Sequence, residues 1–79
     1  MKIPNCFIVL QNHDDLVEIQ SKCNYWKLLK NPYEQDTYFL YHKHPDNQSY
    51  HKQLNDSISL DVAMYYIKRY EDFFCFLTF

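Results

Sequence analysis

The chain of 79 residues contains no glycine. At an ordinary abundance of roughly 7%, about five or six glycines would be expected. Backbone positions that need a positive φ must therefore use Asn or Asp, or be avoided. The absence excludes function classes built on glycine: P-loops, dinucleotide-binding turns, kinase glycine-rich loops, GXSXG nucleophile elbows and GXXG nucleic-acid clamps.

Three other residue types are scarce as well. Ala, Gly, Pro and Arg together supply five residues, whereas Phe, Tyr, Met, Ile, Asn and Lys supply 34. The first set has GC-rich codons and the second has AT-rich codons. This bias predicts an AT-rich source genome, such as a low-GC bacterium or a phage or mobile element that lives in one.

Long apolar runs and clustered positive charge are also missing. The apolar run at residues 6–10 is too short for a signal-peptide core or a membrane span, which predicts a cytoplasmic protein. The net charge is −2, and the basic residues are scattered except for Lys68 and Arg69. Nucleic acid is therefore the less favoured partner. Three distant cysteines without a CxxC spacing predict buried thiols.

Aromatic residues are abundant, with eight Tyr, six Phe and one Trp. A chain this short forms one domain, residues 1–79, and its core is small. Large aromatic side chains compensate, because each can bury roughly 150 to 250 Å².

The first half of the chain predicts a strand followed by a helix. The apolar run within residues 5–11 suits a strand buried on both faces. Residues 12–15 offer helix-capping groups, and Asn31-Pro32 ends the pattern. The residues at helical spacing between them are Leu16, Ile19, Cys23 and Trp26. A strand alternative is set aside here because Ser21 and Trp26 break the period of two.

The second half predicts a strand at 37–43, a turn at 44–48 and a weak strand at 49–54. Capping residues at 55–59 precede a second helix, and residues 73–79 read as a final strand. The apolar side of that helix comprises Leu60, Ala63, Met64, Ile67 and Tyr70 or Glu71. The order β-α-β-(β)-α-β predicts an α+β, ferredoxin-like (split βαβ) fold, with two helices on one face of a three- or four-stranded sheet.

Histidines form the first candidate for chemistry. His42, His44 and His51 lie within ten residues, with Asp46 between them, and could hold a transition metal. The alternative is that these histidines are exposed on a hairpin, and it is preferred because no cysteine lies nearby. Cys23 and Cys75 fall in apolar surroundings that predict inert thiols. We therefore expect no catalytic residues, no cofactor and no enzymatic activity.

The expected sheet has apolar residues on both faces, and two helices can cover only one of them. Either a partner protein, a second copy or stacked bases cover the other face, or the loop at 44–56 folds over it with Tyr50 and Leu54. The leading hypothesis is a protein-binding inhibitor of the anti-defence, anti-CRISPR or immunity type, with a protein partner or a second copy bound through the aromatic sheet face. Its expected contact residues are Tyr38, Tyr41, His42, Tyr50, Tyr65 and Lys68.

Two other functions stay open. A single-stranded nucleic-acid-binding or nucleic-acid-processing domain could stack bases on Tyr38, Phe39 or Tyr41. Its phosphate contacts would come from Lys43, Lys52, Lys68 and Arg69. The third reading is a metal-dependent hydrolase built on the three histidines of residues 42–51.

Overall fold

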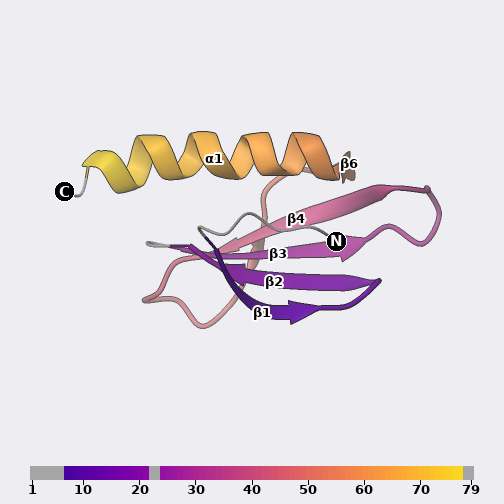
Figure 1. Cartoon of the computed structure of the whole chain (residues 1–79), viewed down its shortest axis with the longest axis horizontal. Helices are drawn as coiled ribbons and strands as arrows, with labels where there is room; N and C mark the ends of the chain where they lie inside the picture. Colours follow the sequence, from indigo (N-terminus) through magenta and orange to yellow (C-terminus); the bar gives the residue numbers. More distant parts are fainter. Residues whose placement is uncertain (1–6, 22–23, 78–79) are drawn as a thin grey trace.

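A computed structural model describes residues 7–21 and 24–77, with side chains up to Asp72. These residues form a six-stranded antiparallel sheet with one long helix across one of its faces (Figure 1). The elements are β1 (Ile8–Asn12), β2 (Leu16–Gln20), β3 (Tyr25–Lys30), β4 (Thr37–Lys43), β5 (His51–Lys52), β6 (Ile58–Ser59) and α1 (Leu60–Leu77).

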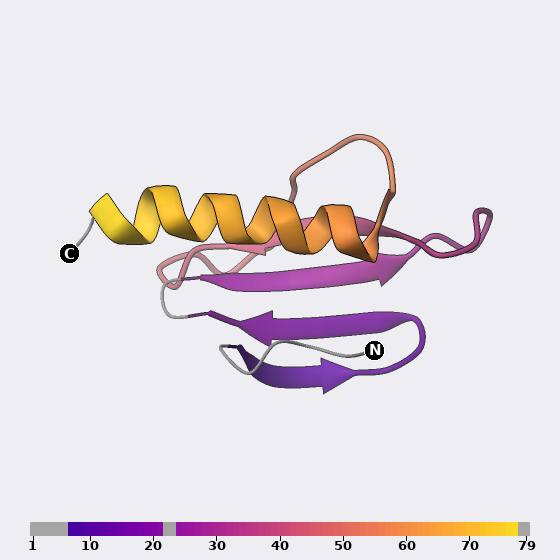
Figure 2. The same ribbon diagram turned by 45° about the horizontal axis from the view of Figure 1, so that its top comes forward.

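The sheet is a meander in which each strand pairs with the next in the order β1-β2-β3-β4-β5. The short strand β6 pairs with the start of β4 and leads directly into α1. Figure 2 shows α1 lying over β4 and β3, while β1 lies at the edge farthest from the helix. This arrangement corrects the predicted ferredoxin-like fold, because the strands follow one another in a six-stranded meander and a single helix, not two, covers the sheet.

The predicted first helix is a β-hairpin. β2 and β3 pair in continuous register from Leu16 opposite Leu29 to Gln20 opposite Tyr25. The period of two breaks at the turn between the strands. There the Ser21 amide donates to the Asn24 carbonyl at 2.8 Å, and the Asn24 amide donates to the Ser21 hydroxyl at 2.9 Å. On either side of that turn, apolar and polar residues alternate. Of residues 12–15, expected to cap a helix, Asn12 ends β1 and residues 13–15 connect it to β2; the His13 amide donates to the Leu16 carbonyl at 2.9 Å.

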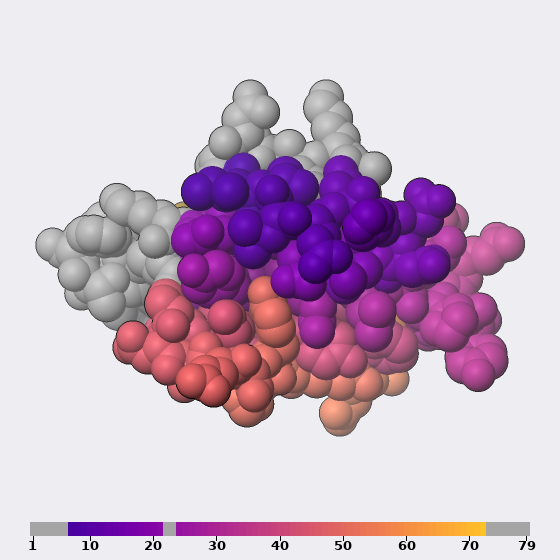
Figure 3. Space-filling model, turned by 90° about the horizontal axis from the view of Figure 1, so that it is seen from below, coloured from indigo at the N-terminus to yellow at the C-terminus, as the bar shows by residue number. Residues whose placement is uncertain are grey.

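The apolar strand expected within residues 5–11 exists in part, but it is exposed and not buried on both faces as expected. β1 covers Ile8–Asn12, residues 5 and 6 lie outside the described ranges, and every residue of β1 is exposed. The reason is position, because β1 is an edge strand and has only β2 as a neighbour in the sheet. Figure 3 views the molecule from the β1 side and shows β1 and β2 at its surface.

The C-terminal helix begins as the sequence predicts and continues farther. The hydroxyl of Ser59, one of the expected caps, accepts from the Val62 amide at 3.3 Å. The backbone stays helical to Leu77, where the sequence predicted a strand at 73–79; residues 78 and 79 lie outside the described ranges. No glycine or proline follows Ser59 to end the helix. Cooperative propagation therefore outweighs the β propensity of the aromatic residues that follow Asp72.

The middle of the chain agrees with prediction. The strand at 37–43 is confirmed as β4, and the weak strand at 49–54 is a two-residue strand, β5. The connection between β3 and β4 contains the one described residue with positive φ, Asp36 at 59°. Aspartate thus takes a left-handed position that glycine would ordinarily fill.

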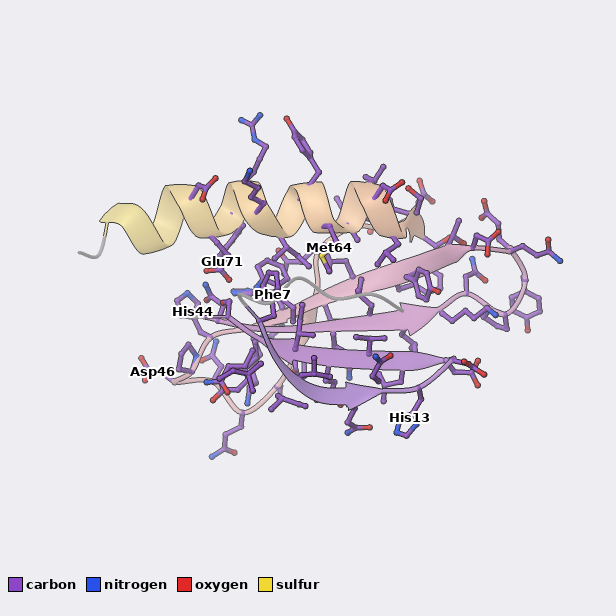
Figure 4. The ribbon with its side chains drawn as sticks, in the orientation of Figure 1. Phe7, His13, His44, Asp46, Met64 and Glu71 are labelled. Carbon is purple, nitrogen blue, oxygen red and sulfur yellow. The ribbon has the colours of Figure 1, made fainter. Side chains whose placement is uncertain are left out.

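The core lies between α1 and the face of the sheet that it covers. The fully buried residues come from β2, β3, β4 and one side of α1: Val17, Ile19, Trp26, Leu28, Leu40, Ala63 and Ile67. Phe7 and Met64 pack against this cluster, and Met64 points from the helix toward the sheet (Figure 4).

Candidate functional site

The face of the sheet opposite α1 is the main candidate for function. Burial alternates along β2 and β3, so that Val17, Ile19, Trp26 and Leu28 are buried while their neighbours are half-buried or exposed. We call this second surface the open face. Its residues are Leu16, Glu18, Gln20, Tyr25, Lys27, Leu29, Phe39, Tyr41 and Lys43, with Tyr50 and Lys52 beside them.

The strand register arranges the open face in three rows. Leu16, Leu29 and Phe39 face one another across β2, β3 and β4 and form an apolar row. The next row contains charges and a ring, in the order Glu18, Lys27, Tyr41 and Lys52. The third pairs Tyr25 with Lys43. One end of the face is therefore apolar and the other carries lysines between aromatic rings.

Lysine ammonium groups lie over the aromatic rings of this face. Lys43 Nζ is 4.4 Å from the centre of the Tyr25 ring, and Lys52 Nζ is 4.2 Å from that of Phe39. Lys27 Nζ lies 5.2 Å from the Tyr41 ring centre and 4.7 Å from the centre of Tyr50. These are cation–π distances. Each of the four rings has an ammonium group over it. The positive charges of the open face therefore lie above its aromatic rings.

Tyr50 attaches the segment that follows β4 to the open face. Its hydroxyl donates to Glu18 Oε2 at 3.4 Å, and Gln11 donates to the other oxygen of Glu18 at 3.1 Å. Burial, together with the neighbouring Glu18 carboxylate, raises the pKa of Tyr50 to about 12. The predicted alternative that residues 44–56 fold over the sheet is thus partly realised through Tyr50.

A second polar group of residues lies on the other face, beneath the C-terminal half of α1. We call Ser21, Asn24, Trp26, His42 and Glu71 the buried polar cluster. The Glu71 carboxylate points from the helix toward the sheet (Figure 4) and accepts from Ser21 Oγ. It also accepts from Trp26 Nε1 at 2.7 Å and from Asn24 Nδ2 at 3.3 Å. Glu71 therefore joins the helix to the end of the β2–β3 hairpin.

His42 completes this cluster and is 7% exposed. Because the Asn24 amide nitrogen faces Glu71, its oxygen faces His42, and His42 Nε2 donates to Asn24 Oδ1 at 2.8 Å. The His42 ring lies 4.6 Å from the rings of Trp26 and Tyr70, centre to centre. Burial lowers the pKa of His42, nearby His44 and His51 lower it further, and Glu71 opposes them.

This cluster does not have the geometry of nucleophilic catalysis. The Ser21 hydroxyl donates to Glu71, whereas a serine nucleophile donates to a histidine that can take its proton. His42 is engaged with Asn24 and covered by aromatic rings. The arrangement fits a packing role, in which buried polar groups are satisfied by one another.

The six predicted contact residues lie on separate surfaces. Tyr41 and Tyr50 share the open face, as described above. His42 is buried, which corrects the expectation that it is exposed on a hairpin. Tyr65 and Lys68 are exposed on α1, where the Tyr65 hydroxyl accepts from Arg69 at 3.0 Å. Tyr38 lies on the helix side of the sheet and packs against the core.

Tyr38 also lines a hollow of about 290 Å³ at the end of the molecule near the β1–β2 turn. The other lining residues are His13, Asp14, Lys30 and Leu60. Figure 4 shows His13 at the opposite end of the molecule from His44 and Asp46. The hollow therefore lies apart from the histidines that the sequence singled out.

Those histidines come near one another without forming a metal site. The His42 and His44 rings are 5.4 Å apart, centre to centre, and His51 pairs with His42 across β4 and β5. Among the described residues, no three His, Cys, Asp or Glu side chains are placed to hold a metal ion. Cys6 and Cys23 lie outside the described ranges, and Cys75 lies beyond the described side chains.

Sequence reasoning missed three of the residues that build the open face: Glu18, Tyr25 and Lys27. All lie in the segment that was interpreted as a helix. The alternation in residues 25–28, with Tyr25 and Lys27 against Trp26 and Leu28, was the available signal.

Within the described ranges, no helix combines the length and the apolar character that crossing a bilayer requires. No family model, no curated protein and no solved structure matches this chain.

Proposed function

We propose that this chain is a non-enzymatic protein-binding module that occupies the surface of a partner through its open face. The observation that carries the proposal is the arrangement of lysine ammonium groups over aromatic rings on that face. Four aromatic rings and three lysines form one continuous surface beside Leu29, which is 38% exposed. Aromatic residues near the centre of a surface patch are the side chains that most often anchor protein interfaces.

The polar groups of the other face support the same assignment. Glu71, Asn24 and His42 are polar side chains that could take part in catalysis, but their hydrogen bonds hold the helix to the sheet. The polar side chains that the structure describes on this face are thus used for packing, which is compatible with a protein that acts by occupying a surface. We therefore assign it an inhibitory role of the anti-defence or immunity type, in the cytoplasm.

A photo-crosslinking amino acid tests this proposal directly. It replaces Leu29 on the open face in one variant and Tyr65, 61% exposed on α1, in a matched control. Irradiation of cells that naturally carry the protein is expected to give a defined protein adduct from position 29 only. Absence of a protein adduct at position 29, or equal adducts from both positions, would count against the open face.

A second candidate function is single-stranded nucleic-acid binding, and a specific observation favours it. Lysines and aromatic rings gather on one face, as they do in proteins that bind single strands. Of the expected contacts, Phe39, Tyr41, Lys43 and Lys52 share that face. Fluorescence anisotropy of labelled single-stranded RNA at low and high salt tests this candidate. Binding that weakens steeply with salt supports it, and absence of binding at low salt excludes it.

A further inference from the structure

The open face differs in charge from the rest of the molecule. Its residues include Lys27, Lys43 and Lys52 against one acid, Glu18, whereas the whole chain has a net charge of −2. Glu18 is already engaged by Gln11 and Tyr50. The face therefore presents positive charge on an otherwise acidic protein, and its complement is negatively charged.

The apolar row restricts the complement further. Leu29 lies two residues from Lys27 on the same face of β3, and side chains two residues apart on a strand are about 7 Å apart. A binding partner that covers Lys27 and Leu29 together must place a negatively charged group over Lys27 and an apolar group over Leu29, about 7 Å apart. A nucleic-acid strand spaces its phosphates along one backbone and could cover the Leu16–Leu29–Phe39 row only by stacking bases on it.

The lysines also work against base stacking. Each of the four rings, Tyr25, Phe39, Tyr41 and Tyr50, has an ammonium group above it. A base could stack on such a ring face only after displacing the lysine and its cation–π interaction. Carboxylates, in contrast, can contact the ammonium groups where they already lie. A second copy joined through the same face would bring lysine against lysine.

On these grounds, and resting on the proposed function, we infer that the open face binds an acidic, amphipathic segment of a partner protein. Its carboxylates contact Lys27, Lys43 and Lys52, and its apolar side chains cover the row centred on Leu29. The interaction is electrostatically guided, and it weakens as salt rises.

The test is a chemical-shift titration of the isotope-labelled full chain with three probes. The first is a short synthetic peptide that alternates Leu or Phe with Asp or Glu. The second has the same sequence with Asn and Gln in place of the acids, and the third is oligo(dT). We expect the acidic peptide alone to shift the signals of Lys27, Leu29, Tyr41 and Lys43, with an affinity that falls as salt is added.

Two double variants with the same change in charge provide the control. Lys43→Glu with Lys52→Glu alters the open face, and Lys68→Glu with Arg69→Glu alters the exposed side of α1. The first pair should weaken peptide binding by roughly tenfold or more, since several favourable charge contacts become repulsive. The second pair should leave the affinity within roughly twofold, because its charges lie off the face.

The outcomes separate this inference from the proposed function. Equal binding of the amide peptide, or stronger binding of oligo(dT), overturns the acidic partner. If position 29 still crosslinks to a protein in cells, the protein-binding function stands and only the acidic chemistry is wrong. If neither the acidic peptide nor any protein contacts the face, both conclusions fail.

Discussion

The two faces of the sheet are built from the same strands and differ in almost every physical respect. Leu28 and Leu29 are neighbours in β3, yet Leu28 is fully buried under α1 and Leu29 is 38% exposed. On the covered face, polar groups are satisfied within the fold, as Glu71 shows by accepting from Trp26 and Asn24. On the open face, lysines lie over rings at the surface. One face therefore provides stability, and the other is the surface that we propose for binding.

The largest difference should appear when the two neighbouring leucines are shortened. Leu28→Ala removes fully buried methyl groups and should lower the free energy of unfolding by about 2–5 kcal/mol. Leu29→Ala should lower it by less than about 1 kcal/mol. Urea unfolding followed by the fluorescence of Trp26, which is the single tryptophan and is buried, measures both. Similar losses in the two variants would break the comparison.

Removal of the Glu71 carboxylate should have the next largest effect. Glu71→Ala leaves the Trp26 indole, the Asn24 amide and the Ser21 hydroxyl without this acceptor, which costs about 2–3 kcal/mol. Asp72→Ala changes the adjacent, exposed acid and serves as the control. The same urea titration should show nearly unchanged stability for Asp72→Ala. An equally stable Glu71→Ala would mean that the cluster does not hold the helix.

A pH dependence should distinguish the buried cluster from surface histidines. The pKa of His42 is lowered in the folded protein, mainly by burial, from an ordinary value of 6.5. The unfolded chain therefore binds a proton first as the pH falls. The contribution of His42 to stability is complete above pH 6.5 and is lost as the pH falls from there through the folded pKa.

This part of the pH profile should disappear in His42→Gln, which keeps an amide donor for Asn24 and does not titrate. His13→Gln, in the exposed β1–β2 turn, serves as a control and should keep the wild-type profile. Thermal unfolding between pH 5 and pH 8 gives the comparison. If His42→Gln shows the same decline as the wild type, another group causes it.

The smallest expected effect on stability lies on the open face. Lys43→Ala removes the cation over Tyr25 and Tyr50 and should cost no more than about 1 kcal/mol, because exposed cation–π contacts are weak. Its urea midpoint should remain close to that of the wild type. A large loss would show that the lysines belong to the structural core and would remove the contrast between the two faces.

Local sequence patterns correctly predicted the elements in which the different sequence signals agree. Residues 37–43 are β-prone and lie between turn-forming segments, and they form β4. The helix that follows Ser59 has its cap and its apolar stripe at Ala63 and Ile67. In these segments, propensity, capping and periodicity all favour the same structure.

The sequence led to a wrong prediction where the helical period and the strand period of two fit the same residues. It also gave no answer where the structure depends on contacts between strands. Leu16, Ile19 and Trp26 fit a helix, but Val17 and Leu28 are the buried residues that complete the hairpin. The turn at Ser21 and Asn24 uses hydrogen bonds in place of the Asn-Gly or Asp-Gly pair that usually marks a hairpin. The open face could not be assembled from sequence, because its rows depend on the register of four strands.

The most direct test of the central claim is the affinity of the partner recovered by crosslinking at position 29. Isothermal titration calorimetry would compare the wild type with the two double charge reversals. We predict that Lys43→Glu with Lys52→Glu weakens binding by roughly tenfold or more, while Lys68→Glu with Arg69→Glu leaves it unchanged. Equal loss in both variants, or loss only when the charges on α1 are reversed, would contradict the assignment of the open face as the binding surface.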